Sequence, residues 1–213
     1  MGEPAIAGMN GKGTKIYDYD WCSTHEGENG LYDERTVDPQ TGALGAPQQI
    51  FQWSVDSIGN SDSVQFIKGL LFAFAYPVAY QPYNELQVYP ITTNKNAKPR
   101  IDCTSTMLAA CGSDTGVAHP WAKYVFYTNA QNNTTDVDAV DLSSKQIVST
   151  GTMFSTPTPN VLEFSPDGSV AYSWERQAST ISIFGFNAST AAITPGGSVT
   201  ESSTISILPT ERR

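Results

Sequence analysis

A repeated pattern of short β-strands separated by turns constrains the fold of this chain more than any other feature. The clearest copy begins at Asn160 and reads NVLEF, the turn SPDG, SVAYSWE, a polar loop, TISIFGF, a second turn and ITPGGSV. Proline, aspartate, glycine and asparagine preset or tolerate turn dihedral angles, so the four runs between them are typical of one four-stranded antiparallel sheet. Helical periodicity is weak throughout, and its best stretch, residues 106–110, is too short for a secure helix.

The same pattern recurs upstream in the chain. Its second strands begin near residues 14, 69, 123 and 169, which are separated by 55, 54 and 46 residues. A pitch of about 40 to 50 residues, widened by loop insertions, is that of β-propeller blades. The sequence therefore predicts an all-β chain with four four-stranded antiparallel blades in a single domain, at approximately residues 4–52, 63–103, 104–152 and 160–200.

Two long segments also resemble a known family. FSPDGSVAYSW followed by STISIFGFNASTAAITPGGSV, together with LYDERTVDPQTGALGAPQQI, is similar to the blades of lactonase-type β-propellers, the group of 6-phosphogluconolactonase-like proteins, and to the related YVTN surface repeats. The resemblance is strong over residues 118–200 and 31–50 and weaker over 53–115. It implies a seven-bladed ring and a lactone-hydrolysing activity, although its motifs mark a blade and not a reaction.

Four blades are fewer than the seven that this resemblance implies. An incomplete ring exposes sheet faces and strand edges that need partners. Three arrangements therefore stay open: a fragment of a longer chain, a half-ring completed by further blades or by another chain, and a closed four-bladed ring.

Charge and hydropathy exclude two classes of partner. With 12 basic and 21 acidic residues the net charge is −9, which repels a nucleic-acid backbone, and no basic patch is visible. The longest apolar run, residues 69–80, contains Pro77 and is shorter than the roughly 20 residues that a spanning helix needs. We expect neither nucleic-acid binding nor a membrane span.

The cysteines and the sequence start bear on location. Cys22, Cys103 and Cys111 cannot all pair within one chain, and Cys103 with Cys111 fits either a bridge between neighbouring strands or two unpaired thiols. No zinc-ligand spacing occurs, so we expect no metal site and no cofactor. The start lacks the regions of a signal peptide, but the sequons at Asn132, Asn133 and Asn187 favour a secreted, periplasmic or cell-surface protein over a cytoplasmic one.

In a propeller, the loops that join second to third strands gather at one end of the central channel, where function usually lies. Residues 21–30, 77–84, 130–136 and 175–179 should form this loop mouth. The candidate binding residues that these segments and the strand ends beside them carry are Glu26, Glu28, Tyr80, Tyr83, Asn84 and Asn129. The tyrosines fit stacking against a sugar or another flat ligand.

Three residues of the same loops are the catalytic candidates. His25 beside two carboxylates fits a general base, and Glu175 with Arg176 fits an acid beside an anion-binding guanidinium. A solvated acidic loop and an ordinary surface ion pair are the competing interpretations. Asp136, Asp138 and Asp141 match a calcium loop only in part, which favours strand-edge and turn roles, and His119 should lie at the opposite end in a structural role.

Two functions follow from these patterns. The first is a non-enzymatic module that binds a small molecule, a glycan or a protein at the loop mouth, since no common nucleophile, metal or phosphate motif occurs. The second is a lactonase-like hydrolase, which the family resemblance implies.

Overall fold

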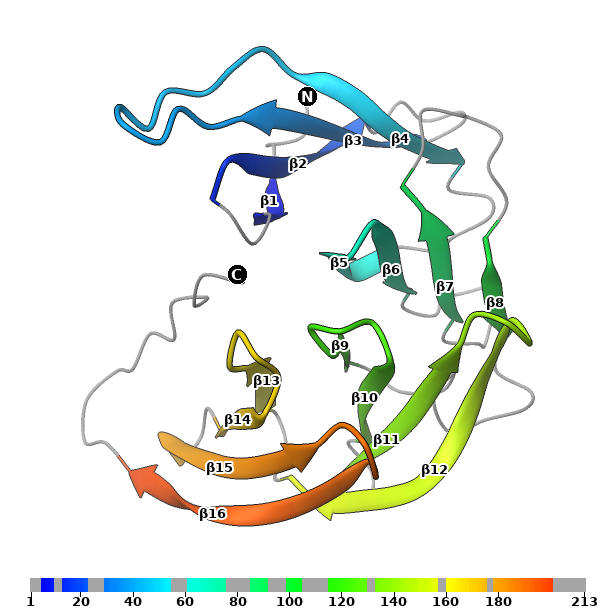
Figure 1. Cartoon of the computed structure of the whole chain (residues 1–213), viewed down its shortest axis with the longest axis vertical. Helices are drawn as coiled ribbons and strands as arrows, with labels where there is room; N and C mark the ends of the chain where they lie inside the picture. Colours follow the sequence, from blue (N-terminus) through cyan, green and yellow to red (C-terminus); the bar gives the residue numbers. More distant parts are fainter. Residues whose placement is uncertain are drawn as a thin grey trace.

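The computed structural model describes residues 5–9, 13–22, 29–54, 61–75, 85–91, 99–104, 115–129, 133–156, 160–175 and 178–200. Within these ranges all regular secondary structure is β-strand, arranged in four antiparallel sheets of four strands each (Figure 1). No helix in the described ranges is long and apolar enough to cross a membrane. The predicted all-β propeller fold is confirmed.

Each sheet is one blade built from four consecutive strands. Blade 1 contains β1 (Ala5–Met9), β2 (Lys15–Cys22), β3 (Asn29–Thr36) and β4 (Gln48–Ser54). Blade 2 contains β5 (Ser61–Ile67), β6 (Leu70–Ala75), β7 (Glu85–Pro90) and β8 (Ile101–Thr104). Blade 3 contains β9 (Thr115–Ala118), β10 (Tyr124–Asn129), β11 (Thr134–Asp141) and β12 (Gln146–Ser155). Blade 4 contains β13 (Asn160–Phe164), β14 (Val170–Glu175), β15 (Thr180–Asn187) and β16 (Ala192–Thr200).

The blades stand side by side around a common axis, with the first strand of each innermost and the fourth outermost (Figure 1). Blade 1 packs on blade 2, blade 2 on blade 3, and blade 3 on blade 4. Blades 1 and 4 lie at the two ends of an arc, so the closed four-bladed ring is not the arrangement seen. The blade boundaries proposed from the sequence fall in or near the connections and remain predictions. Cys111 lies outside the described residues.

Turn chemistry closes the hairpins as expected from the sequence. In the turn between β13 and β14, the Asp167 carboxylate accepts a hydrogen bond from the Ser165 hydroxyl at 2.6 Å and one from the Ser169 amide at 3.0 Å. These bonds, the Ser165 bond first, lower the pKa of Asp167 to about 2. Gly168 follows with φ +72°, a conformation that glycine adopts without steric cost.

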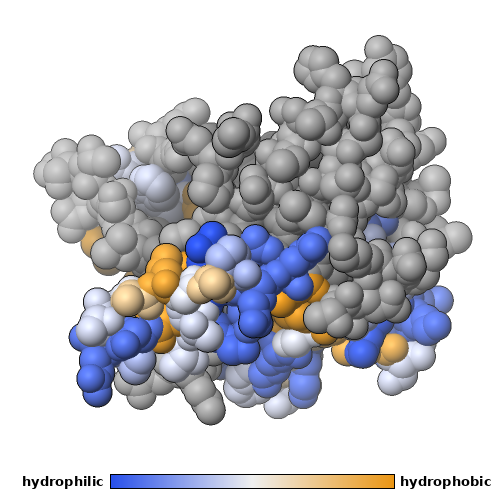
Figure 2. Space-filling view, turned by 90° about the horizontal axis from the view of Figure 1, so that it is seen from above, coloured by the Kyte–Doolittle hydropathy of each residue, from blue (hydrophilic) through white to orange (hydrophobic). Residues whose placement is uncertain are grey.

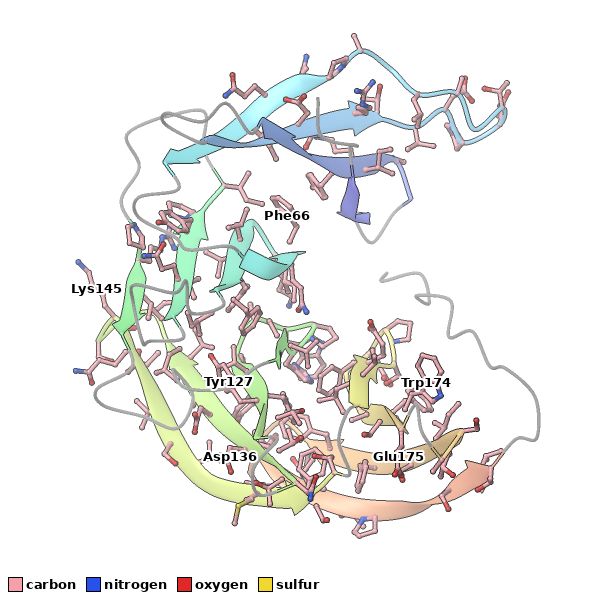
Figure 3. All side chains as sticks on the ribbon, turned by 180° about the vertical axis from the view of Figure 1, so that it is seen from behind. Phe66, Tyr127, Asp136, Lys145, Trp174 and Glu175 are labelled. Carbon is pink, nitrogen blue, oxygen red and sulfur yellow. The ribbon has the colours of Figure 1, made fainter. Side chains whose placement is uncertain are left out.

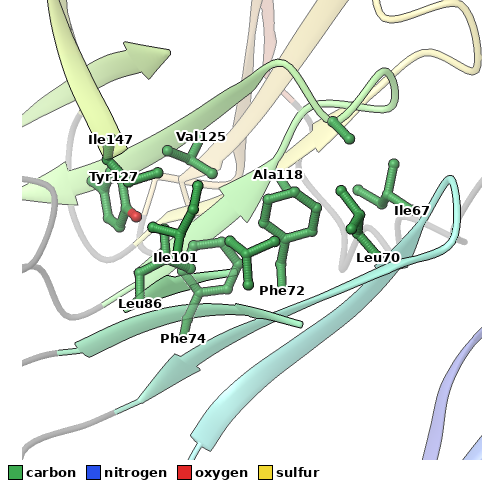
Figure 4. Close-up of a cluster of buried hydrophobic side chains, with 12 residues drawn as sticks. Ile67, Leu70, Phe72, Phe74, Leu86, Ile101, Ala118, Val125, Tyr127 and Ile147 are labelled. Carbon is green, nitrogen blue, oxygen red and sulfur yellow. The ribbon is translucent and has the colours of Figure 1, made fainter. Parts of the chain in front are cut away.

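The core lies between blades and not inside them. Between blades 2 and 3, the side chains of Phe72, Leu86 and Val88 meet those of Ala118 and Val125, and none of the five is more than 1% exposed (Figure 4). One face of each of these two sheets is thus covered by the other sheet. In Figure 2 most of the described surface is hydrophilic, with smaller hydrophobic patches between.

An aromatic cluster fills the space between blades 3 and 4. The ring of Phe126 lies 4.7 Å from that of Phe164 and 5.1 Å from that of Phe186, both edge to face. This arrangement suits aromatic rings, because the positive edge of one meets the negative face of the other.

His119 joins these two blades at the turn end of the cluster. Its side chain is fully buried, its Nε2 donates to the Gly168 carbonyl at 3.0 Å, and its Nδ1 accepts from the Trp121 amide at 3.2 Å. This pattern requires the neutral imidazole, and burial lowers the pKa of His119. The residue lies at the end opposite the loop mouth, in the structural role expected from the sequence.

The contact between His119 and Gly168 gives a first prediction. A Cβ at Gly168 would overlap the buried imidazole, whereas Gly42 has the same φ of +72° and no atom within 4 Å of its added Cβ. We expect Gly42→Ala to cost about 1 kcal/mol of unfolding free energy from backbone strain alone, and Gly168→Ala about 2 to 4 kcal/mol. Urea unfolding measures both variants, and equal losses would show that the His119 contact contributes nothing.

Candidate functional site

The second-to-third connection of every blade leaves from the same end of the sheet. That end also holds the beginning of each innermost strand, because β1, β5, β9 and β13 run antiparallel to their neighbours. The residue pairs that close the four connections are Cys22 with Asn29, Ala75 with Glu85, Asn129 with Thr134, and Glu175 with Thr180. The strand ends from which the four connections leave therefore lie at one end of the blades, which we call the mouth end; most residues of the connections themselves lie outside the described part of the chain.

Most candidate residues lie outside the described part of the chain. These are His25, Glu26, Glu28, Tyr80, Tyr83, Asn84 and Arg176. Asn129 is the last residue of β10 and Glu175 is the last residue of β14, so both lie at the mouth end of adjacent blades.

Glu175 occupies a defined position at the mouth. It pairs with Asn160 on one side and with Thr180 on the other, and it is partly buried. Alternation along β14 places it on the face of Ala171, which packs toward blade 3, while Trp174 points the other way (Figure 3). Glu175 is thus at the mouth end of blade 4, on the face turned toward blade 3.

A chain of buried hydroxyl groups supports the mouth of blade 3. The Thr128 and Thr135 hydroxyls are 3.1 Å apart, and Thr135 and Thr156 are 2.7 Å apart. The Thr156 amide also donates to the Asn133 carbonyl at 2.9 Å, which fixes the base of the mouth loop. In blade 2 the equivalent cross-strand pair is apolar, Phe74 with Leu86. The pair of threonines in blade 3, where the repeat otherwise has apolar residues, is the feature of the sequence that could have indicated the network.

A second polar group lies in the wall between blades 2 and 3. Asp136 and Asp138 alternate along β11 and pair with Tyr127 and Val125 of β10, on the face of blade 3 that packs toward blade 2. Asp138 is only 3% exposed, and its pKa is raised to about 6. Burial is the largest cause, and the charge of Asp136 raises the pKa further, while a hydrogen bond from Ser149 partly offsets both effects. Burial also raises the pKa of Asp136.

The Tyr127 hydroxyl is buried beside these carboxyl groups. It has no hydrogen-bond partner among the described residues, and burial followed by the charge of Asp138 raises the pKa of Tyr127 well above the ordinary value. Tyr127 and Asp136 occupy paired positions on β10 and β11 (Figure 3). The group thus contains two carboxyls with raised pKa values next to a phenol whose pKa is also raised.

The three aspartates of this segment differ in role. Asp141 accepts hydrogen bonds from the Ser143 and Ser144 amides, which is the turn role expected from the sequence. For Asp138 the strand-edge or turn role is wrong, because its side chain is buried between blades. Among the described residues no cluster of three or more histidines, cysteines, aspartates or glutamates is placed to hold a metal ion.

Asp138 gives a prediction about pH. Its folded pKa of about 6 lies above its ordinary value of 3.8, so its effect on stability becomes unfavourable as pH rises through this interval. We expect Asp138→Asn to stabilise the protein by up to about 3 kcal/mol at pH 7.5 and to have no such effect below pH 4. Thermal unfolding across pH 3.5 to 8 measures the difference.

Asp141→Asn is the matched control for this experiment. Hydrogen bonds from Ser144 and Ser143 lower the pKa of Asp141, so its replacement should destabilise the protein at neutral pH. A stability gain of Asp138→Asn that stays constant with pH would contradict the assignment.

Comparisons with known proteins show the fold of the chain. Neither a scan against protein-family models nor a search of curated protein sequences found a match. Solved structures do match: one is a candidate 6-phosphogluconolactonase from Bacteroides uniformis, with a TM-score of 0.56 and 13% identity over 90% of this chain and 55% of that one. Another is a functionally unknown protein from Desulfotomaculum acetoxidans, with a TM-score of 0.54 and 11% identity over 93% of this chain and 56% of that one.

A third similar structure is a periplasmic gluconolactonase from Pseudomonas aeruginosa. Its TM-score is 0.50 and its identity 13%, over 92% of this chain and 70% of that one. The chain thus spans just over half the length of the first two structures. These likenesses support the lactonase-type resemblance at the level of the fold.

Proposed function

We propose that the chain is a ligand-binding propeller module and that the ligand binds at the loop mouth. The observation that carries this proposal is the shared end of the four second-to-third connections, which the strand registers bring to one side of the blades. A packed scaffold with loops gathered at one end is a common design for recognition sites.

The chemistry of the described residues favours binding over catalysis. His119 is the one histidine in the described ranges, and it is fully buried with both ring nitrogens engaged, far from the mouth. Asp138 has a raised pKa but is closed off between blades 2 and 3. Neither group meets the geometric requirement that an acid or base reach its substrate.

The ligand we propose is a hydroxylated small molecule or glycan. Tyr80 and Tyr83 would stack on its ring, while Asn84, Asn129, Glu26 and Glu28 would bind its hydroxyl groups. An exported location, periplasmic or at the cell surface, agrees with this ligand class and with the similarity to a periplasmic gluconolactonase.

A lactonase-like hydrolase is the second candidate. Glu175 favours it, since its carboxylate lies at the mouth, and two of the similar structures carry gluconolactonase names. In this case His25 or Glu175 would activate water, and Arg176 would polarise the lactone carbonyl.

Binding is tested by isothermal titration calorimetry with gluconate and with glucono-1,5-lactone. We expect Tyr80→Ala and Tyr83→Ala each to weaken binding about tenfold, because each removes a stacking surface. Trp121→Ala is the control, since Trp121 is an exposed aromatic residue at the opposite end of blade 3. Loss of binding in the control, or binding that neither tyrosine affects, would contradict the proposed mouth.

Hydrolysis of the same lactone separates the two functions. A rate of lactone hydrolysis equal to that in buffer without protein, together with unchanged ligand binding, supports the binding module. A rate above buffer that falls at least about a hundredfold in Glu175→Gln, His25→Ala or Arg176→Ala supports the hydrolase and removes the first proposal.

A further inference from the structure

The basic residues of the described ranges all lie at one end of the blades. We call this end the turn end. It lies opposite the mouth end, and the connections there join the first strand of each blade to the second and the third to the fourth. Each of these basic residues lies in such a connection or within two residues of it, and the set is Lys15, Arg35, Lys68, Arg100, Lys123 and Lys145. The described part of the mouth end contains no basic residue.

The sequence hides this arrangement. The six residues are far apart along the chain, so they form no basic run, and the chain as a whole has a net charge of −9. The fold gathers them, because every second connection in a sheet of consecutive antiparallel strands returns to the same end. The molecule therefore has a basic end although it is acidic overall.

Four of these cations form a patch on blades 2 and 3. Lys68 and Lys123 follow the innermost strands β5 and β9, and Arg100 and Lys145 precede the outermost strands β8 and β12. All four residues are exposed, and Lys145 marks the outer rim of the arc (Figure 3). Strand spacings of roughly 4.8 Å and sheet spacings of roughly 10 Å place neighbouring members on the order of 10 Å apart. We call these four residues the basic patch.

No described acidic side chain neutralises the basic patch. None of its four cations forms an ion pair within the described ranges. Asp141 and Asp167 lie at the same end, but their carboxylates accept hydrogen bonds from the serines of their own turns. Burial lowers the pKa of His119, and the charges of Lys68 and Lys123 lower it further while Asp167 acts in the opposite direction, so the two lysines act on one region. The positive charge of the patch is thus available to a partner.

Two exposed apolar side chains lie within the basic patch. Trp121, in the turn between β9 and β10, is 44% exposed, and Leu142, in the turn between β11 and β12, is 36% exposed. Each shares its turn with a lysine of the patch, and the Lys68 ammonium lies 6.0 Å from the centre of the Trp121 ring. Apolar side chains beside cations suit the surface of an anionic bilayer, because the apolar groups enter the headgroup region while the cations bind the lipid charges.

We propose that the turn end of blades 2 and 3 docks on the surface of an anionic lipid bilayer, with Trp121 and Leu142 at the level of the headgroups. The net charge of −9 sets the orientation, since an anionic surface repels the molecule except at the basic patch. A soluble polyanion would bind the cations but would leave Leu142 in water, so the exposed apolar side chains favour the bilayer. In this orientation the mouth end faces away from the lipid.

Co-sedimentation with lipid vesicles tests the electrostatic part of the proposal. We expect the chain to bind phosphatidylcholine vesicles that contain phosphatidylglycerol, not to bind pure phosphatidylcholine vesicles, and to dissociate in 1 M salt, where the screening length is about 3 Å. Lys123→Gln should weaken binding about fivefold, since one cation near the lipid surface is lost. Ser155→Asp is the matched control, because it changes the net charge by the same amount from an exposed position at the mouth end of the same blade.

Quenching of tryptophan emission by brominated lipids tests the position of Trp121. We expect the emission of the bound wild-type chain to be quenched. Trp121→Phe should lose most of this quenching, although the other tryptophans remain in the variant.

The same measurements can overturn the proposal. No preference for anionic vesicles, or equal effects of Lys123→Gln and Ser155→Asp on binding, overturns the docking surface. Quenching that Trp121→Phe leaves unchanged places another part of the chain on the lipid and also overturns it. Binding to alginate, a soluble polyuronate, without binding to vesicles assigns the basic patch to an anionic polysaccharide instead. None of these measurements includes the ligand of the mouth, so their outcome is independent of the function proposed above.

Discussion

Burial of sheet faces between adjacent blades is the interaction on which this structure depends. A blade is a four-stranded sheet with apolar side chains on both faces, so it cannot bury them within itself. Phe72 and Phe126 are each at most 1% exposed only because a neighbouring blade covers them. Full burial of such a side chain contributes about 1.5 to 3 kcal/mol, so a few of them on each face outweigh any polar contact at the surface. Polar segments are consequently confined to the two ends of the blades, and the loop mouth follows from this.

Polar groups that do enter the blade contacts are accommodated in different ways. The threonine hydroxyls between blades 3 and 4 bond to one another, and His119 uses both ring nitrogens, so neither incurs much desolvation cost. The desolvation of Asp138 and Tyr127 between blades 2 and 3 is less well compensated, since the carboxyl has a raised pKa and the hydroxyl has no hydrogen-bond partner in the described part of the chain. The contact between blades 2 and 3 therefore loses stability as pH rises and Asp138 ionises.

The sequence predicts the fold well because its signals are local. The turn at Asp167 and Gly168 and the aromatic residues at alternate positions, such as Phe72 and Phe74, define strands, registers and the blade pitch. It does not predict the burial of Asp138, because alternation distinguishes two faces and both faces of a blade are buried. Nor does it predict the geometry of the mouth, since topology brings Asn129 and Glu175 to one end without fixing what their side chains bind.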